Sequence, residues 1–169
     1  MARRAWSKKH QRGLTLAEVA VGTLLLVGGI GPLLLGMHYT MIRIEYLNQF
    51  QVAMSAVEGE LEVLMNTSFD TLWADPSFAS ARGSGLKVPI AQLAVAGGNL
   101  SVQIRSADLK TPGTPTVLDL YVSACWQTRG RRIGEDLNCN GSLDAGEDTN
   151  GNGWLDSPAM ASTRVARSG

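Results

Sequence analysis

Arg12-Gly13-Leu14-Thr15-Leu16-Ala17-Glu18-Val19 is the stretch that decides how this chain is organised. Before it lies a basic leader, because the first 13 residues contain five Lys or Arg and no acid. After it, the 24 residues from Leu14 to Met37 carry one charge, Glu18. At about 1.5 Å per residue, such a helix can span a bilayer with the basic end in the cytoplasm. A carboxylate inside such a helix is costly and usually has a function.

Two simpler interpretations of this segment exist. An ordinary secretory signal peptide would have a shorter apolar core that ends in a small-residue cleavage site. A plain signal anchor would have the observed length. Neither explains why Gly13 stands directly before the apolar run and Glu18 directly inside it.

The arrangement resembles the class III signal of type IV prepilins and type II secretion pseudopilins. Gly13 matches the residue before the cleaved bond, while Leu14 and Ala17 replace the family's usual phenylalanine and a larger aliphatic residue. The other matches are to the second, third, fifth and sixth mature residues: Thr15, Leu16, Glu18 and Val19. The resemblance covers about residues 9–66. It implies that a prepilin peptidase cuts after Gly13 and methylates Leu14, and that Glu18 pairs with the N-terminal amine of a neighbouring subunit.

Gly28-Gly29-Ile30-Gly31-Pro32 interrupts the apolar run with residues that destabilise helices. One interpretation is a small-residue contact between membrane helices. The other follows from the resemblance, because this zone of pilins loses helicity in the assembled filament. The two interpretations are compatible.

Residues 38–66 predict an amphipathic continuation of the helix. Its apolar positions recur at intervals of three, four or seven: Met41, Ile44, Leu47, Met54, Val57, Leu61 and Leu64. Such a stripe needs a partner, most simply a sheet. The predicted fold is therefore α+β and pilin-like, with a long N-terminal helix packed on a small antiparallel β-sheet head over 67–169.

In the head, residues 67–98 are rich in Ser, Ala, Gly and Pro and predict an irregular connection that could include a short helix or strand. Alternating apolar residues then predict one strand near 100–105 and another over 117–126, with a turn at 111–115 between them. A last strand is expected at about 159–166. Three antiparallel strands against a helix make a plausible small head.

A twelve-residue calcium loop is predicted between the last two strands. Oxygen-bearing side chains occupy loop positions 1, 3, 5, 9 and 12, and Gly141 at position 6 permits the sharp turn. Ser142 at position 7 would offer its backbone carbonyl. The five side chains are Asp136, Asn138, Asn140, Asp144 and Glu147.

A second copy of the loop follows without a gap. Its predicted ligands are Asp148, Asn150, Asn152, Trp154 through its carbonyl, and Asp156. Position 12 is Ala159, so the bidentate acid is missing. We expect a weaker site, or one that borrows a ligand such as Glu147 or a water. An Asp/Asn/Gly-rich surface turn is the simpler alternative for both loops.

The flanks of these loops read as strands, so the insert at 135–157 resembles thrombospondin type 3 or dockerin-like calcium loops more than a paired-helix EF-hand sensor. Without a cation its acids would repel one another, so Ca²⁺ is expected to stabilise the head. Only two cysteines occur, Cys125 and Cys139, and in an exported head they could form a disulfide. Cys139, at a non-ligating loop position, could instead face solvent.

Composition narrows the function. Without residues 1–13 the chain has 10 basic and 15 acidic residues, and no basic patch with aromatics predicts nucleic-acid binding. No histidine lies in the head, since His10 and His38 precede it, so an enzyme is not expected.

The sequence therefore predicts a minor pilin or minor pseudopilin, of the PilV or GspI type. It would sit in the bacterial inner membrane as a single pass and later in a periplasmic or extracellular filament. The expected partners are other subunits, prepilin peptidase and the inner-membrane assembly platform. A pilus, a secretion pseudopilus and a DNA-uptake filament all remain open. The alternative is a membrane-anchored, calcium-dependent protein-binding module outside any filament.

Overall fold

The structure is a computed structural model that describes residues 15–108 and 115–167. The predicted leader, with Gly13 and Leu14, lies outside these residues, as does most of the predicted turn at 111–115. The described chain divides into two compact units, which meet between Ile44 and Glu45. One continuous helix, α1 (Leu16–Asn66), supplies all the helix of the first unit and enters the second.

The first unit is the apolar part of α1. Its large apolar side chains are exposed, with Leu24 at 73% and Leu35 at 71% of their accessible surface. By length and composition this helix could cross a membrane. Residues 28–32 are helical despite the glycines and Pro32, which a lipid-exposed helix tolerates.

The second unit contains a sheet of five strands and several short helices. The strands are β1 (Leu86–Pro89), β2 (Asn99–Ser106), β3 (Val117–Thr128), β4 (Arg131–Ile133) and β5 (Met160–Ala166). The order is β1-β2-β3-β4 with β5 also on β3, and every pair is antiparallel. The short helices are α2 (Phe69–Ala74), η1 (Pro76–Phe78), α3 (Ala79–Arg82) and η2 (Ala91–Ala96).

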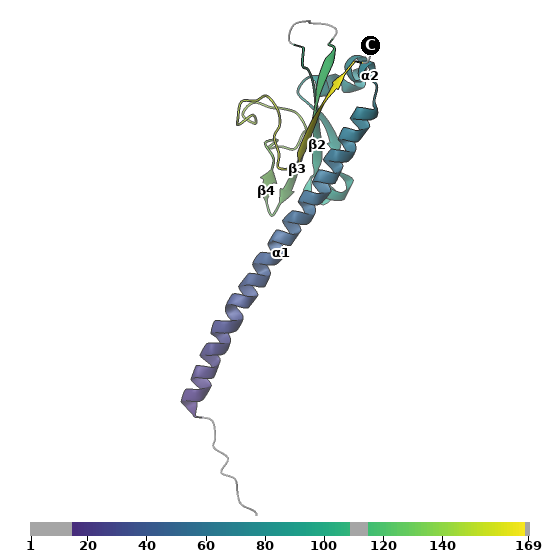
Figure 1. The fold of residues 1–169 in the computed structure, drawn as a ribbon. Coiled ribbons are helices and arrows are strands. Elements are labelled where there is room, and N and C mark those ends of the chain that lie inside the picture. Colours follow the sequence, from purple (N-terminus) through teal and green to yellow (C-terminus); the bar gives the residue numbers. More distant parts are fainter. Residues whose placement is uncertain (1–14, 109–114, 168–169) are drawn as a thin grey trace, which may run out of the picture. The chain divides into compact units, whose positions relative to one another are not determined.

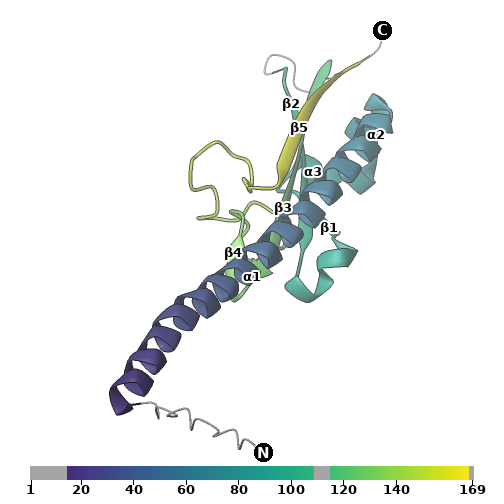
Figure 2. The ribbon, with the colours of Figure 1, turned by 60° about the horizontal axis from the view of Figure 1, so that its bottom comes forward.

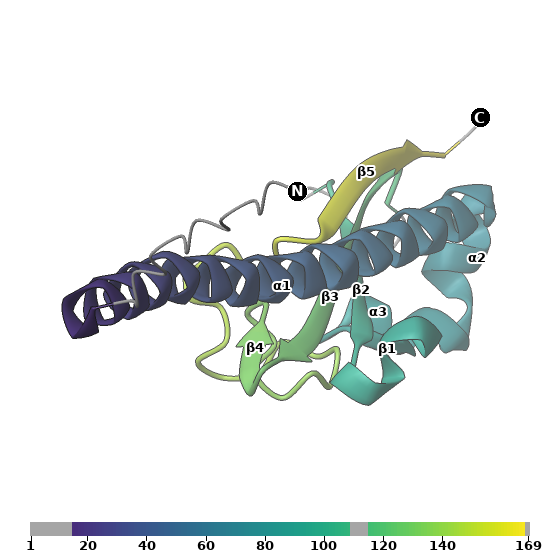
Figure 3. The same ribbon diagram turned by 90° about the horizontal axis from the view of Figure 1, so that it is seen from below.

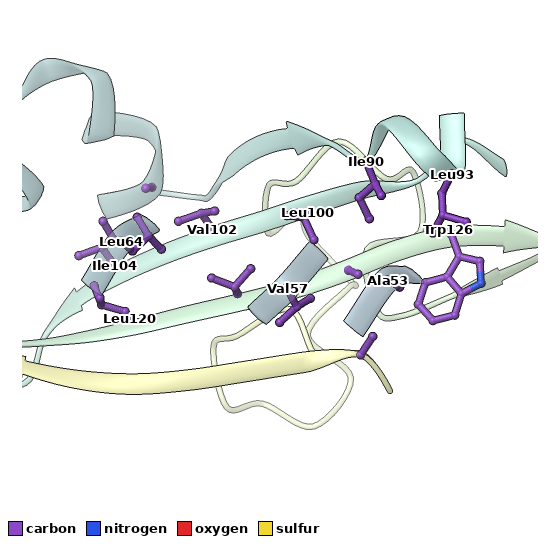
Figure 4. Close-up of a cluster of buried hydrophobic side chains, with 14 of the residues drawn as sticks. Ala53, Val57, Leu64, Ile90, Leu93, Leu100, Val102, Ile104, Leu120 and Trp126 are labelled. Carbon is purple, nitrogen blue, oxygen red and sulfur yellow. The ribbon is translucent and has the colours of Figure 1, made fainter. Parts of the chain in front are cut away.

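The core of this unit lies between the C-terminal part of α1 and one face of the sheet (Figures 1 and 3). Alternation of side chains along β2 and β3 places their apolar residues on that face, as predicted. Figure 4 shows Ala53 and Val57 of α1 against Leu100, Leu120 and other strand residues. Trp126 closes one end of the core and is 0% exposed.

The predicted α+β class is thus confirmed, with corrections to its parts. β4 was missed, and residues 67–98 contain several short helices and β1, which is more regular structure than the predicted irregular connection with a short helix or strand. The apolar stripe of α1 is buried only in part. Val57 and Leu64 are in the core, whereas Met41, Ile44 and Leu47 are at least half exposed.

Candidate functional site

The N-terminus of α1 is capped by its own residues. The Thr15 backbone N–H and hydroxyl donate to Glu18 Oε2 at 2.9 and 3.0 Å, and the Glu18 N–H donates to Thr15 Oγ1 at 3.3 Å. This reciprocal pair is a capping box. Within a single chain the Glu18 carboxylate therefore has polar partners, which sequence reasoning missed although the Thr-x-x-Glu pattern was present.

The segment between β4 and β5, residues 134–159, lies on the sheet face opposite α1 (Figures 1 and 2). Its first loop touches the β1–β2 edge. The Leu143 N–H donates to the Ser84 carbonyl at 2.7 Å, and Ser101 Oγ donates to the Gly141 carbonyl at 2.7 Å. A Cβ on Gly85 would lie 2.0 Å from the Gly141 oxygen, so this contact requires glycine at 85.

The second loop lies over β2 and β3. The Leu155 N–H donates to Gln103 Oε1 at 3.0 Å, and Arg105 donates to the Gly153 carbonyl. The Trp154 ring stacks on Tyr121 with centroids 4.9 Å apart, and the Arg105 guanidinium lies 3.9 Å from the Trp154 centroid. The two loops together bury the polar face of the sheet, including Gln103 at 1% exposure.

In the first loop, hydrogen bonds join the predicted ligands to one another and to the loop backbone. Asp136, 3% exposed, accepts from the Asn140 N–H at 3.1 Å and the Gly141 N–H at 2.7 Å. Asp144 Oδ2 accepts from the side-chain amides of Asn138 and Asn140, both at 2.8 Å. Glu147 at position 12 then closes the loop, because it accepts from the Leu137 N–H at 2.8 Å and the Asp144 N–H at 3.0 Å.

The second loop repeats these contacts position by position. Asp148 accepts from the N–H groups of Asn152 at 3.0 Å and Gly153 at 2.8 Å. Asp156 Oδ2 accepts from the side-chain amides of Asn150 at 2.6 Å and Asn152 at 2.8 Å. The two loops therefore have the same residue types at equivalent positions and the same hydrogen bonds between those positions.

In the second loop Glu135 takes the place that Glu147 takes in the first, whereas the sequence suggested a borrowed ligand such as Glu147 or a water. Glu135 accepts from the Asp156 N–H at 3.0 Å and the Thr149 N–H at 3.3 Å. These N–H groups occupy the same loop positions, 9 and 2, that Glu147 engages in the first loop. Each glutamate thus stands directly before one loop and closes the other. The recurrence of Glu-Asp at 135–136 and 147–148 was the signal in the sequence.

The two position-7 residues were predicted to ligate through their carbonyls. The structure shows hydrogen bonds from the backbone N–H groups of these two residues. Ser142 donates to Asn140 Oδ1 and Trp154 to Asn152 Oδ1, both at 2.7 Å. That their carbonyls bind a cation stays a prediction.

A disulfide joins Cys125 of β3 to Cys139, with Cα atoms 5.6 Å apart. Of the two possibilities for Cys139, a disulfide or exposure to solvent, the structure therefore has the disulfide. Cys139 has a positive φ of 53°, and Gly151 at the same position of the second loop has 71°. Position 4 thus requires a left-handed backbone in both loops, which glycine adopts freely and cysteine rarely does. The disulfide holds that conformation in the first loop.

The chemistry of the donor set suits a hard divalent cation. Each loop places carboxylates beside the side-chain amides of two asparagines, and carboxylate and amide oxygens are the ligands that such a cation prefers. Burial opposes ionisation of Asp156, but hydrogen bonds from Tyr121, Asn150 and Asn152 lower its pKa. Among residues 15–108 and 115–167, however, no three His, Cys, Asp or Glu side chains converge as a metal cluster.

Comparison of the chain with protein-family models, with curated proteins and with solved structures found no significant match.

Proposed function

We propose that this protein is a structural subunit of a type IV pilus or type II secretion pseudopilus, in a minor position. One observation carries the proposal. A single helix, α1, has an exposed apolar part whose only charge before Arg43 is Glu18, and a second part packed on an antiparallel sheet. The resemblance over about residues 9–66 supplies the particular class.

The decisive experiment is the mass of the N-terminal peptide. The full chain is expressed with and without a prepilin peptidase and extracted from the membrane. We expect a mature chain that begins at Leu14 and carries one N-methyl group, only when the peptidase is present. An intact leader, or a cut beyond Met37, would leave an anchored or secreted protein instead.

We also infer that the insert binds two Ca²⁺ ions that stabilise the head. The support is the duplicated donor pattern, in which Glu147 and Glu135 occupy equivalent places. Bound Ca²⁺ would supply positive charge among carboxylates that otherwise repel one another. Asp136 and Asp148 would hold the first ligand position of each site, and the flanking glutamates the last.

The alternative, a calcium-dependent binding module, differs in what the insert does for the sheet. Here the insert buries polar residues of β2 and β3, such as Gln103 and Ser123, against its own backbone. A partner module could be removed without harm to the head. Deletion of 135–157 in the full chain, followed by thermal unfolding, separates the two: a structural insert predicts a destabilised head.

A further inference from the structure

The hairpin that joins β3 to β4 carries three arginines in four residues. Arg129 and Gly130 form its turn, with φ of 48° and 80°, and Arg131 and Arg132 begin β4. All three arginine side chains are exposed. Positive φ at both central residues is the geometry of a tight type I′ hairpin, so the three arginines lie at or beside the tip of this hairpin.

The hairpin is fixed to the first residues of α1 in the second unit. Arg129 donates to Glu45 Oε2 from Nε at 3.1 Å and from Nη2 at 2.9 Å. Beside this contact, the ring centroids of Tyr46 and Trp126 lie 6.4 Å apart. The end of the head that bears the hairpin is therefore the end at which α1 enters it.

The charge at this end is not balanced. Within the described part of the chain the ion pairs are Arg129–Glu45, Arg164–Asp119 and Arg167–Asp70, so Arg131 and Arg132 have no carboxylate partner. Two exposed guanidinium groups with free donors are suited to phosphate, which they bind in bidentate fashion.

The sequence of α1 indicates what lies next to the end of the head that bears the hairpin. The apolar run ends at Met37, and Tyr39 and Arg43 follow, a combination typical of the membrane–water interface. Glu45 is eight residues beyond Met37, or about 12 Å of helix rise. The polar headgroup layer is roughly 5–8 Å deep on each side, and an arginine extends its charge several ångströms from its backbone.

We propose that Arg131 and Arg132 bind the phosphates of anionic phospholipids in the leaflet from which the head emerges, before the subunit leaves the membrane. The inference rests on the proposed membrane-anchored function. The two arginines should bind an anionic lipid surface more strongly than a neutral one, because each basic residue is attracted to the negative charge of the surface.

The test uses the full chain in nanodiscs of neutral phosphatidylcholine or of phosphatidylcholine with phosphatidylglycerol. Arginines are modified with phenylglyoxal, and the rate at each site is read by mass spectrometry. We expect modification of Arg131 and Arg132 to be about fivefold slower in the anionic discs and to recover at high salt. Arg164 is the internal reference, because its partner Asp119 lies ten residues, or about 33 Å, before Arg129 along β3.

A pair of variants serves as a second readout. In anionic discs, hydrogen exchange of the backbone at 128–132 should be slower than in neutral discs. This difference should vanish in Arg131→Gln/Arg132→Gln and persist in Lys87→Gln/Arg167→Gln, which removes two exposed positive charges elsewhere on the head.

Equal modification rates in the two kinds of disc would overturn the inference alone, provided that the chain stays in the disc. A chain that is not retained in any disc would overturn the membrane-anchored function as well. Protection in neutral discs that rises with the number of chains per disc would assign the arginines to a second copy of the chain. Protection by inorganic phosphate in neutral discs would show an anion site without lipid preference.

Discussion

At the scale of single residues, Glu135 shows how a functional position can hide outside its own motif. It precedes the first loop in sequence but accepts two backbone N–H groups from the second, at 3.0 and 3.3 Å. A loop motif read along the chain assigns ligands only from within the loop. In the structure Glu135 reaches the neighbouring loop, where its carboxylate stands in the place for which the second loop's own sequence offers Ala159.

Substitution of Glu135 should weaken one calcium site and spare the other. Glu135→Gln keeps the size of the side chain but removes a charge from the second loop. We expect its affinity to fall by roughly 10-fold or more while the first site is unchanged. Isothermal titration of the full chain in detergent micelles with CaCl₂ measures both, and Glu147→Gln should give the reciprocal pattern. Loss of both sites in Glu135→Gln would contradict independent closure of the two loops.

Glu18 has a role in its own helix that differs from its proposed role in assembly. Glu18→Gln retains an oxygen for the Thr15 N–H but removes the charge, and Glu18→Ala removes both. If charge pairing between subunits matters, both variants should be cleaved by the peptidase and enter filaments poorly. If capping of the α1 N-terminus is what matters, only Glu18→Ala should enter filaments poorly. Counting labelled subunits in sheared filaments distinguishes the two.

Glu60 of α1 gives a prediction about pH. Burial raises its pKa, so the folded head favours the protonated form. Its contribution to stability is full below the ordinary pKa of about 4.5 and is lost as pH rises through the folded value. Glu60→Gln should therefore raise the melting temperature at pH 7 and leave it unchanged near pH 3.5. Glu58→Gln, on an exposed position of the same helix, is the control. An equal rise in both variants would point to net charge instead.

At the scale of elements, alternation predicted the strands that have a long apolar face and missed those that do not. β2 and β3 alternate clearly, and their register pairs Leu100 with Ala124 and Val102 with Val122. β1 has four residues and ends in proline, and β4 has three, so neither offers a period to detect. The burial of the polar face could not be predicted, because alternation implies that Ser101, Gln103 and Ser123 face solvent unless something covers them.

The disulfide should be the main covalent support of the first loop. It closes a segment with a sequence separation of 14 residues, for which the loss of unfolded-state entropy is worth about 3 kcal/mol. Cys125→Ser/Cys139→Ser should unfold at lower temperature in a thermal melt followed by circular dichroism. Cys139→Gly in the same background should recover part of the loss, since glycine adopts the left-handed φ without strain. No difference between Ser and Gly at 139 would show that backbone conformation there is unimportant.

At the scale of the whole molecule, the insert and the second part of α1 cover opposite faces of one sheet. The face toward α1 is apolar and needs only burial, whereas the other is polar and needs hydrogen-bond partners. The insert supplies them from its backbone, as the Leu155 N–H does for Gln103. Its acids cannot come together without cost, so the proposed cation would stabilise the cover of this polar face as well as the loops themselves.

Removal of calcium should therefore destabilise the head as a unit. For each site, free Ca²⁺ at 100 times its dissociation constant adds about 2.7 kcal/mol to the free energy of unfolding, and EDTA removes it. We expect the melting temperature of the full chain in detergent to fall by several degrees with EDTA and to recover with CaCl₂. Excess MgCl₂ should not restore it, because Mg²⁺ is smaller and keeps its water. The variant Glu135→Gln/Glu147→Gln should show little response to either addition, since each loop lacks its closing carboxylate. A parent chain that melts at the same temperature with and without Ca²⁺ would reduce the two loops to surface turns.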